Sequence, residues 1–143
     1  MATTMGRLMA SAKPSHKRRV TDHPVFGDLA PAEAKALRKA AKPMSFPQNA
    51  TIQIGGRVDR RCFVVFDGLV ELSDGETSIE CGPGGVFGDA GSYGRAIPAT
   101  AIARTNVKTF VIPSLVMANL ANSNPGVAAR LAPGASESNS LAG

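Results

Sequence analysis

The sequence predicts a mainly β domain with flanking helices. Between residues 44 and 112 it contains many short runs rich in Val, Ile, Phe and Thr, which Gly, Pro, Asp and Asn separate from one another. Short strands at this spacing are typical of a β-sandwich or a β-barrel. Segments that favour helix precede and follow this region. At 143 residues the chain is long enough for one domain with a core of its own.

Composition divides the chain into three parts. Residues 1–20 are basic and contain no acidic residue, which predicts a flexible arm; an organellar transit peptide, or contact with nucleic acid or membrane phosphates, are the alternatives. Residues 21–132 are expected to form the β domain, and the Ser-rich residues 133–143 a disordered tail. Residues 1–43 carry a net charge of +6 and the remainder −1, so the excess positive charge belongs to the N-terminal part.

A first helix is predicted over residues 31–41. Proline suits the first turn of a helix, Ala, Glu, Lys and Leu favour its interior, and Pro43 would stop it. The apolar positions expected on its buried side are Leu29, Leu37, Ala40 and Ala41.

Seven strands are predicted, and two Asp-Gly pairs mark tight turns between them. Asp and Gly tolerate the positive φ that hairpin turns require. We therefore expect one hairpin at Asp67-Gly68 and a second at Asp74-Gly75. The predicted strands cover residues 44–46, 51–54, 61–66, 69–72, 77–81, 99–103 and 107–112.

The C-terminal part predicts a helix over residues 114–120. Asn122-Ser123-Asn124 would break it, and Pro125 would start a last turn or two with Val127 and Leu131 as its apolar positions. We expect no helix-turn-helix unit, and therefore no sequence-specific DNA binding.

Several function classes are not expected. Cys62 and Cys81 lack the spacing of a zinc site and are expected to be reduced, structural thiols, with a disulfide between them as the alternative. His16 and His23 precede the β region, and no catalytic or metal-binding constellation is visible, so we expect no enzyme. The chain has no apolar run of about 20 residues and no signal peptide, which predicts a cytoplasmic protein without a membrane span.

The stretch Cys81–Ala103 is the part of the sequence that points most directly to a ligand. Its first half contains five glycines around the apolar pair Val86-Phe87, and Asp89, Arg95 and Thr100 also lie in the stretch. Glycines allow a backbone to lie close to a ligand, and exposed amides at a short helix start suit a phosphate. The alternative is a glycine-rich connection between two strands.

The order of residues in this stretch resembles the phosphate-binding cassette of cyclic nucleotide-binding domains. Phe87-Gly88-Asp89 and the later run Ala99-Thr100-Ala101-Ile102-Ala103 match the family pattern, in which Phe-Gly-Glu leads through a short helix to Pro-Arg-x-Ala-Thr. The resemblance covers roughly residues 25–131 and implies a jelly-roll β-barrel. It also implies cAMP or cGMP as the ligand and no other cofactor.

The cassette departs from the family pattern at two positions. The resemblance implies that its Glu accepts a hydrogen bond from the ribose 2′-hydroxyl and that its Arg pairs with the cyclic phosphate. Asp89 stands at the Glu position and Ile97 at the Arg position, while Arg95 lies two residues earlier. Losing a hydrogen bond to a charged group weakens binding by about 1.5–3 kcal/mol. The implied site comprises Phe87, Gly88, Asp89, Ala90, Arg95, Ile97, Ala99 and Thr100.

These observations lead to two expectations of function. The first is a stand-alone sensory or regulatory module with weakened or lost cAMP or cGMP binding, in which Arg95 substitutes for the missing arginine. Its output partner would be another protein chain, or it would act as a homo-oligomer. The alternative is a ligand-free structural or protein–protein interaction subunit built on the same barrel. A third, weaker possibility is contact with nucleic acid through the basic arm alone.

Overall fold

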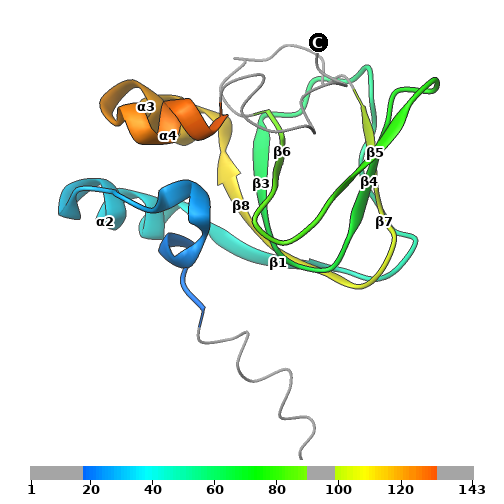
Figure 1. Ribbon diagram of the computed structural model, residues 1–143, viewed down its shortest axis with the longest axis horizontal. Helices are drawn as coiled ribbons and strands as arrows, with labels where there is room; N and C mark the ends of the chain where they lie inside the picture. Colours follow the sequence, from blue (N-terminus) through cyan, green and yellow to red (C-terminus); the bar gives the residue numbers. More distant parts are fainter. Residues whose placement is uncertain (1–17, 90–98, 132–143) are drawn as a thin grey trace, which may run out of the picture.

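The computed structural model describes residues 18–89 and 99–131. Its strands form two antiparallel four-stranded sheets that face one another (Figure 1). The mainly β fold predicted from the sequence is confirmed, although the hydrogen bonding of the described strands leaves two separate sheets rather than one closed barrel. In order across each sheet, the first contains β1 (Lys42–Phe46), β8 (Val107–Pro113), β3 (Arg61–Asp67) and β6 (Val86–Gly88), and the second contains β2 (Thr51–Gln53), β7 (Thr100–Ala103), β4 (Val70–Ser73) and β5 (Ser78–Cys81).

Strand β3 contributes to two apolar layers, because successive side chains of a strand point to opposite faces. Phe63 and Val65 are fully buried between the two sheets. Cys62 and Val64 are equally buried on the opposite face, against the helices. A strand buried on both faces is a continuous apolar run in the sequence, as Cys62 to Phe66 is.

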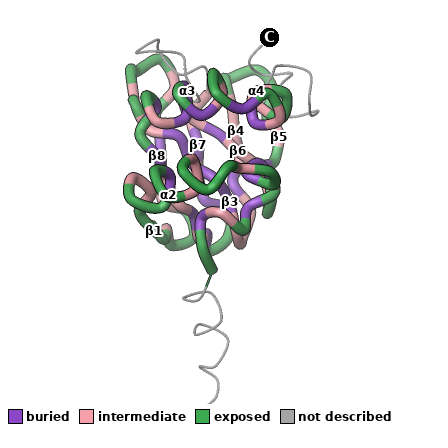
Figure 2. The backbone as a smooth tube through the Cα atoms, turned by 90° about the vertical axis from the view of Figure 1, so that its left-hand side faces the viewer, coloured by how far each residue is buried: buried purple, intermediate pink, exposed green. Residues whose placement is uncertain are grey.

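The helices all lie on the outer face of the first sheet (Figure 1). Figure 2 views the molecule from this side and shows exposed helical surface in front of buried strand residues. Two short 3-10 helices, which were not predicted, precede the first predicted helix. The helices are η1 (Val20–Asp22), η2 (Pro24–Phe26), α2 (Pro31–Ala40), α3 (Ser114–Ser123) and α4 (Pro125–Leu131).

The starts of α2 and α4 follow the predicted signals, whereas α3 runs to Ser123 and so continues past its predicted end at residue 120. At the start of α2, the backbone N–H of Ala30 donates to the Glu33 carboxylate at 2.8 Å. The buried side of α2 is formed by Leu37, which is fully buried, with Leu29 and Ala41 packing beside it. At the start of α4, the Asn124 side chain accepts hydrogen bonds from the next turn and so caps the helix.

One predicted hairpin is confirmed and the other is wrong. Strands β4 and β5 pair across the Asp74-Gly75 turn. Strands β3 and β4 do not pair, because Asp67-Gly68 carries the chain from the first sheet to the second. Gly68 has a φ of 91°, as a tight turn requires, but a Cβ there would overlap the backbone of Asn106 and Val107. This close approach leaves no room for a side chain at position 68, where the chain crosses from one sheet to the other.

The terminal segments are only partly described. The predicted arm lies outside the described residues except for its last three residues, and the predicted tail lies wholly outside them. Arg18 forms an ion pair with Asp67 at 3.0 Å, and Val20 is buried. Among the helices that the structure describes, none has the length and apolar character needed to cross a membrane.

Candidate functional site

The Phe87-Gly88-Asp89 motif lies at the end of β6, where this strand meets the start of β3. The backbone N–H of Asp89 donates to the carbonyl oxygen of Arg61 at 2.9 Å. Gly88 has a φ of 93°, and a Cβ at this position would come within 2.6 Å of that same carbonyl oxygen. Glycine is therefore required here for the strand to end as it does. Asp89 is only 1% exposed.

The second half of the motif lies at the start of β7, in the facing sheet. The Thr100 hydroxyl accepts a hydrogen bond of 2.8 Å from the backbone N–H of Gly55. Gly55 itself packs against Ala99, so closely that a Cβ would lie 3.0 Å from the Ala99 carbonyl carbon. The predicted ligand residue Thr100 thus joins the loop after β2 to β7.

Gln53 connects the two halves of the site. It lies on β2, paired with Ala101 of β7, and is 4% exposed. A Cβ at Gly88 would lie 3.1 Å from its amide oxygen, so the Gln53 side chain reaches across to β6. The structure therefore brings Phe87, Gly88 and Asp89 to the same end of the two sheets as Ala99 and Thr100. The other predicted site residues, Ala90, Arg95 and Ile97, lie outside the described residues.

Asp59 and Arg61 add a charged pair to this end of the molecule. Nε and Nη2 of Arg61 donate to the two carboxylate oxygens of Asp59 at 2.9 and 2.8 Å. These bonds hold the pKa of Asp59 below its usual range and raise the pKa of Arg61. The guanidinium carbon lies 5.1 Å from the centre of the Phe63 ring, which stacks on Phe87 at 4.9 Å. The guanidinium of Arg61 therefore packs against the aromatic pair Phe63 and Phe87, which lies between the sheets.

Gln53, Asp59 and Arg61 were not predicted as site residues from the sequence. One usable signal was strand alternation, which puts Arg61 on the same face of β3 as Phe63. The Nε2 atom of Gln53 is buried. It lies near enough to Asp59 to help lower the pKa of that carboxyl, but it has no partner with hydrogen-bond geometry among the described residues. A buried polar atom without a hydrogen-bond partner is unusual in a folded protein and points to a polar role for this end of the molecule.

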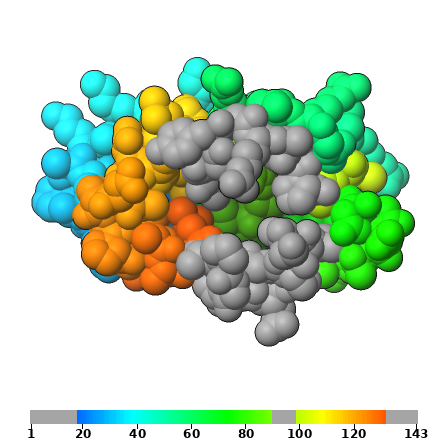
Figure 3. Space-filling model, turned by 90° about the horizontal axis from the view of Figure 1, so that it is seen from above, coloured from blue at the N-terminus to red at the C-terminus, as the bar shows by residue number. Residues whose placement is uncertain are grey.

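We name the end of the molecule where these residues meet the sheet mouth, defined by Gln53, Asp59, Arg61, Gly88 and Asp89. Figure 3 shows the molecule from above this end, with α3 and α4 on one side and the β4–β5 hairpin on the other. The sheet mouth brings together one guanidinium, two carboxylates and one amide beside the stacked rings of Phe63 and Phe87. Such a mixture suits a polar ligand that carries an anionic group and a planar ring.

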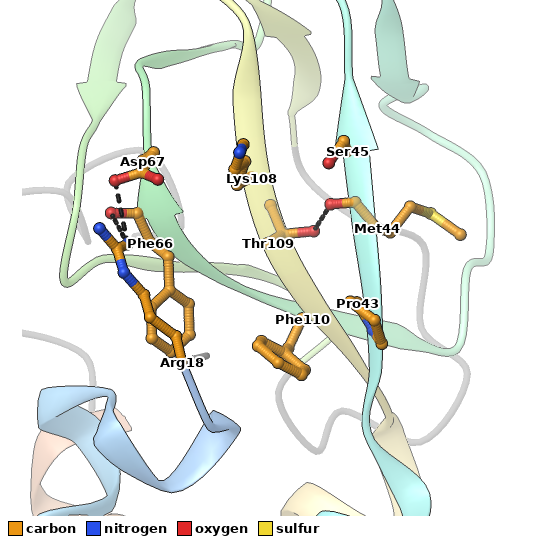
Figure 4. Close-up of a pocket in the computed structure, with 9 residues that line it drawn as sticks. All are labelled: Arg18, Pro43, Met44, Ser45, Phe66, Asp67, Lys108, Thr109 and Phe110. Atoms are coloured by element: carbon orange, nitrogen blue, oxygen red, sulfur yellow. Dashed lines mark hydrogen bonds and ion pairs between the residues drawn. The ribbon is translucent and has the colours of Figure 1, made fainter. Parts of the chain in front are cut away.

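A hollow lies on the outer face of the first sheet, away from the sheet mouth (Figure 4). It has a volume of about 240 Å³. Phe66 and Phe110 meet edge to face at 5.4 Å in its wall, and Arg18 lies over Phe66 at 5.7 Å. Strand β1 forms one side and is the edge strand of its sheet as described, with Met44 38% exposed. We call this hollow the β1 groove.

Cysteine and histidine in the described part of the chain have structural environments. Cys62 and Cys81 are free, buried thiols, as predicted, and burial raises the pKa of both, that of Cys81 to about 11. His23 is 1% exposed; its Nδ1 accepts from the Val25 N–H, so its Nε2 donates to the Val65 carbonyl oxygen at 3.1 Å. Within residues 18–89 and 99–131, no cluster of His, Cys, Asp and Glu has the arrangement of a metal site.

Solved structures with a similar fold come from regulatory proteins. The sensor domain of the transcriptional regulator DNR from Pseudomonas aeruginosa is 17% identical, with a TM-score of 0.66 over 78% of this chain and 84% of that one. The catabolite activator protein of Thermus thermophilus is 24% identical, with a TM-score of 0.60 over 76% of this chain and 54% of that one. The structure of PKAR CBD2 bound to Sp-2Cl-cAMPS is 16% identical, with a TM-score of 0.66 over 85% of both chains.

Sequence comparison identifies the family. No curated protein matches this chain. The sequence model of the cyclic nucleotide-binding domain matches residues 43–124, from β1 to the end of α3 and therefore more than half of the chain. This match agrees with the two facing sheets and with the Phe87-Gly88-Asp89 turn at the end of β6. The chain therefore belongs to the cyclic nucleotide-binding domain family.

Proposed function

We propose that this chain is a regulatory module that receives a cyclic nucleotide weakly, at the sheet mouth, and acts through another protein chain. The observation that carries this proposal is the position of Gly88 and Asp89 at the end of β6, beside the residues that hold the start of β7. This is where the family resemblance expects a ribose and a cyclic phosphate. PKAR CBD2, whose fold is similar, was solved with a cAMP analogue bound.

Two features support weak rather than tight binding. Ile97 occupies the position at which the family pattern has arginine, and an isoleucine has no donor for a phosphate. Asp89 is 1% exposed, so a ribose hydroxyl reaches its carboxylate only after the surrounding residues move. Both effects subtract from the binding free energy, the first by about 1.5–3 kcal/mol.

Action through a partner follows from the kind of domain this is. Binding domains of this family regulate, and a bound ligand changes activity only through differential contacts in two states of a complex. We propose that the output partner is another protein chain or a second copy of this one. The cassette follows β6 directly, so a ligand there would first affect the strand that pairs with β3.

Isothermal titration with cAMP and cGMP tests the proposal, using the native protein and Ile97→Arg. Restoring a guanidinium at position 97 is expected to strengthen binding by about 10- to 150-fold. Leu115→Arg is the matched control, because it also exchanges an apolar side chain for arginine but on the exposed surface of α3. Unchanged affinity in a folded Ile97→Arg protein would show that the cassette alignment is wrong.

The alternative function is a protein–protein interaction subunit that retains the fold without the ligand. The β1 groove favours it, because an edge strand beside exposed apolar side chains can pair with an extended segment of another chain. The same titration separates the two. If native protein gives no heat with either nucleotide while Ile97→Arg binds, the site has the family geometry but has lost its ligand, and the alternative is favoured.

A further inference from the structure

We propose that Arg61 is the group that binds the ligand's phosphate in this chain, and that Asp59 competes with the ligand for it. The inference rests on the proposed function, because it assigns a cation to the same sheet mouth. It concerns residues on β3 and on the loop before it, outside the cassette stretch. The weak affinity then has a second cause: the guanidinium that would hold the phosphate is already engaged by a carboxylate.

Arg61 lies next to the cassette residue Asp89. Its carbonyl oxygen accepts the Asp89 N–H at 2.9 Å, so the two residues are neighbours across β3 and β6. Its guanidinium lies on the Phe63 ring, on the face of β3 that looks toward the second sheet. The Arg61 side chain is 43% exposed, while Gln53 and Asp89 are almost fully buried. Arg61 is therefore the most exposed of the charged side chains at the sheet mouth.

A guanidinium can bind a phosphate in the same way as it binds a carboxylate. Arginine has five N–H donors in a planar fork, which matches the oxygen spacing of a carboxylate or a phosphate. Asp59 engages Nε and Nη2, which leaves the Nη1 donors outside that bidentate contact. An ion pair that is partly open to water contributes little to stability, so exchanging one oxyanion for another costs little. A phosphate at the sheet mouth can replace Asp59.

Arg60 and Arg104 do not fit this role. Arg60 precedes β3 and is exposed, and its carbonyl oxygen accepts the Ser114 N–H at the start of α3. Arg104 lies after β7 and pairs with Glu71 at 3.4 Å. Arg61 alone among these three rests on the aromatic pair between the sheets. Arg60 instead provides a control of equal charge at a neighbouring position.

The proposal predicts opposite effects for the two members of the pair. Asp59→Asn keeps the size of the side chain and removes its charge, which frees Arg61 and removes repulsion toward a phosphate. It is expected to tighten cAMP and cGMP binding by about 3- to 10-fold. Asp59→Asn/Arg61→Gln is expected to lose about 10- to 150-fold relative to Asp59→Asn. Asp59→Asn/Arg60→Gln has the same net charge as that double variant and is expected to bind like Asp59→Asn.

The experiment is isothermal titration of the full chain and these variants with cAMP, cGMP and adenosine, with thermal unfolding of each unliganded variant as the check on folding. Adenosine has the base and ribose without a phosphate, so its binding is expected to be the same in all variants. Equal cAMP affinity with and without Arg61 would overturn the inference and leave the proposed function standing. The inference also fails, and the proposed function stands, if the native protein binds nucleotide, Ile97→Arg binds it more tightly, and Asp59→Asn gains nothing. No binding by any variant, Ile97→Arg included, would overturn both.

Discussion

At the scale of single residues, His23 is a buried side chain that ties the N-terminal turns to the β domain. Its imidazole accepts from the Val25 N–H and donates to the Val65 carbonyl oxygen, and its ring lies 5.3 Å from that of Phe66. Burial lowers the pKa of His23 to about 4. The neutral ring is thus part of the folded structure, and protonation opposes folding.

A pH dependence of stability follows from this histidine. Above pH 6.5 the ring is neutral in both the folded and the unfolded chain, so its contribution is complete. Between about pH 6.5 and 4 only the unfolded chain takes up the proton, so the free energy of unfolding is expected to fall by about 3 kcal/mol. Urea unfolding at pH 7 and pH 5 measures the part of this change expected over that interval, about 2 kcal/mol. A His23→Gln variant should show less of it, and an equal loss in both proteins would contradict the assignment.

Single residues at the sheet mouth show what sequence reasoning could and could not reach. Gly88 and Asp89 could be proposed as ligand residues from the sequence because they belong to a contiguous motif with a known order. Arg61 could not, because the role proposed for it depends on the pairing of β3 with β6 and on the stacking of Phe63 against Phe87. Neither contact has a local signature. Gln53, which lies near Asp59, also lies against Gly88 from a different part of the chain.

At the scale of elements, the two Asp-Gly turns look alike in the sequence but differ in the fold. Both glycines have positive φ, 91° at Gly68 and 97° at Gly75. At Gly75 a Cβ would meet nothing within 4 Å, whereas at Gly68 it would overlap the backbone of Asn106. The dipeptide predicts the local conformation in both cases. The dipeptide does not decide whether the next strand pairs or crosses to the other sheet. That depends on the neighbours of each strand: β3 pairs with β6 and β8, and β4 pairs with β5 and β7.

The two glycines therefore give a matched pair of substitutions. Gly75→Ala is expected to cost about 1–2 kcal/mol of stability, because only the positive φ is penalised. Gly68→Ala is expected to cost about 1–3 kcal/mol more, because backbone must also move to admit the methyl group. Thermal unfolding of both variants measures the difference. Equal losses would mean that the close approach at Gly68 does not constrain the crossing.

At the scale of the whole molecule, most of the architecture could be predicted and the arrangement of strands in sheets could not. The strand runs, the helix over residues 31–41 and the family pattern around Phe87 lead to the right fold class. The division into sheets β1-β8-β3-β6 and β2-β7-β4-β5 is set by contacts far apart in the sequence. The turns η1 and η2 were also missed, because they are short and are stabilised by His23 and Val65 rather than by helix propensity.

Binding of a cyclic nucleotide at the sheet mouth, rather than elsewhere on the molecule, is tested most directly by NMR. The measurement is the change in backbone amide shifts on titration with millimolar cAMP, which detects even weak binding. We expect the amides of Arg61, Gly88 and Asp89 to shift with one common affinity, while those of Met44 and Thr109 in the β1 groove do not. Shifts confined to the β1 groove, or none anywhere at millimolar cAMP, would contradict binding at the sheet mouth.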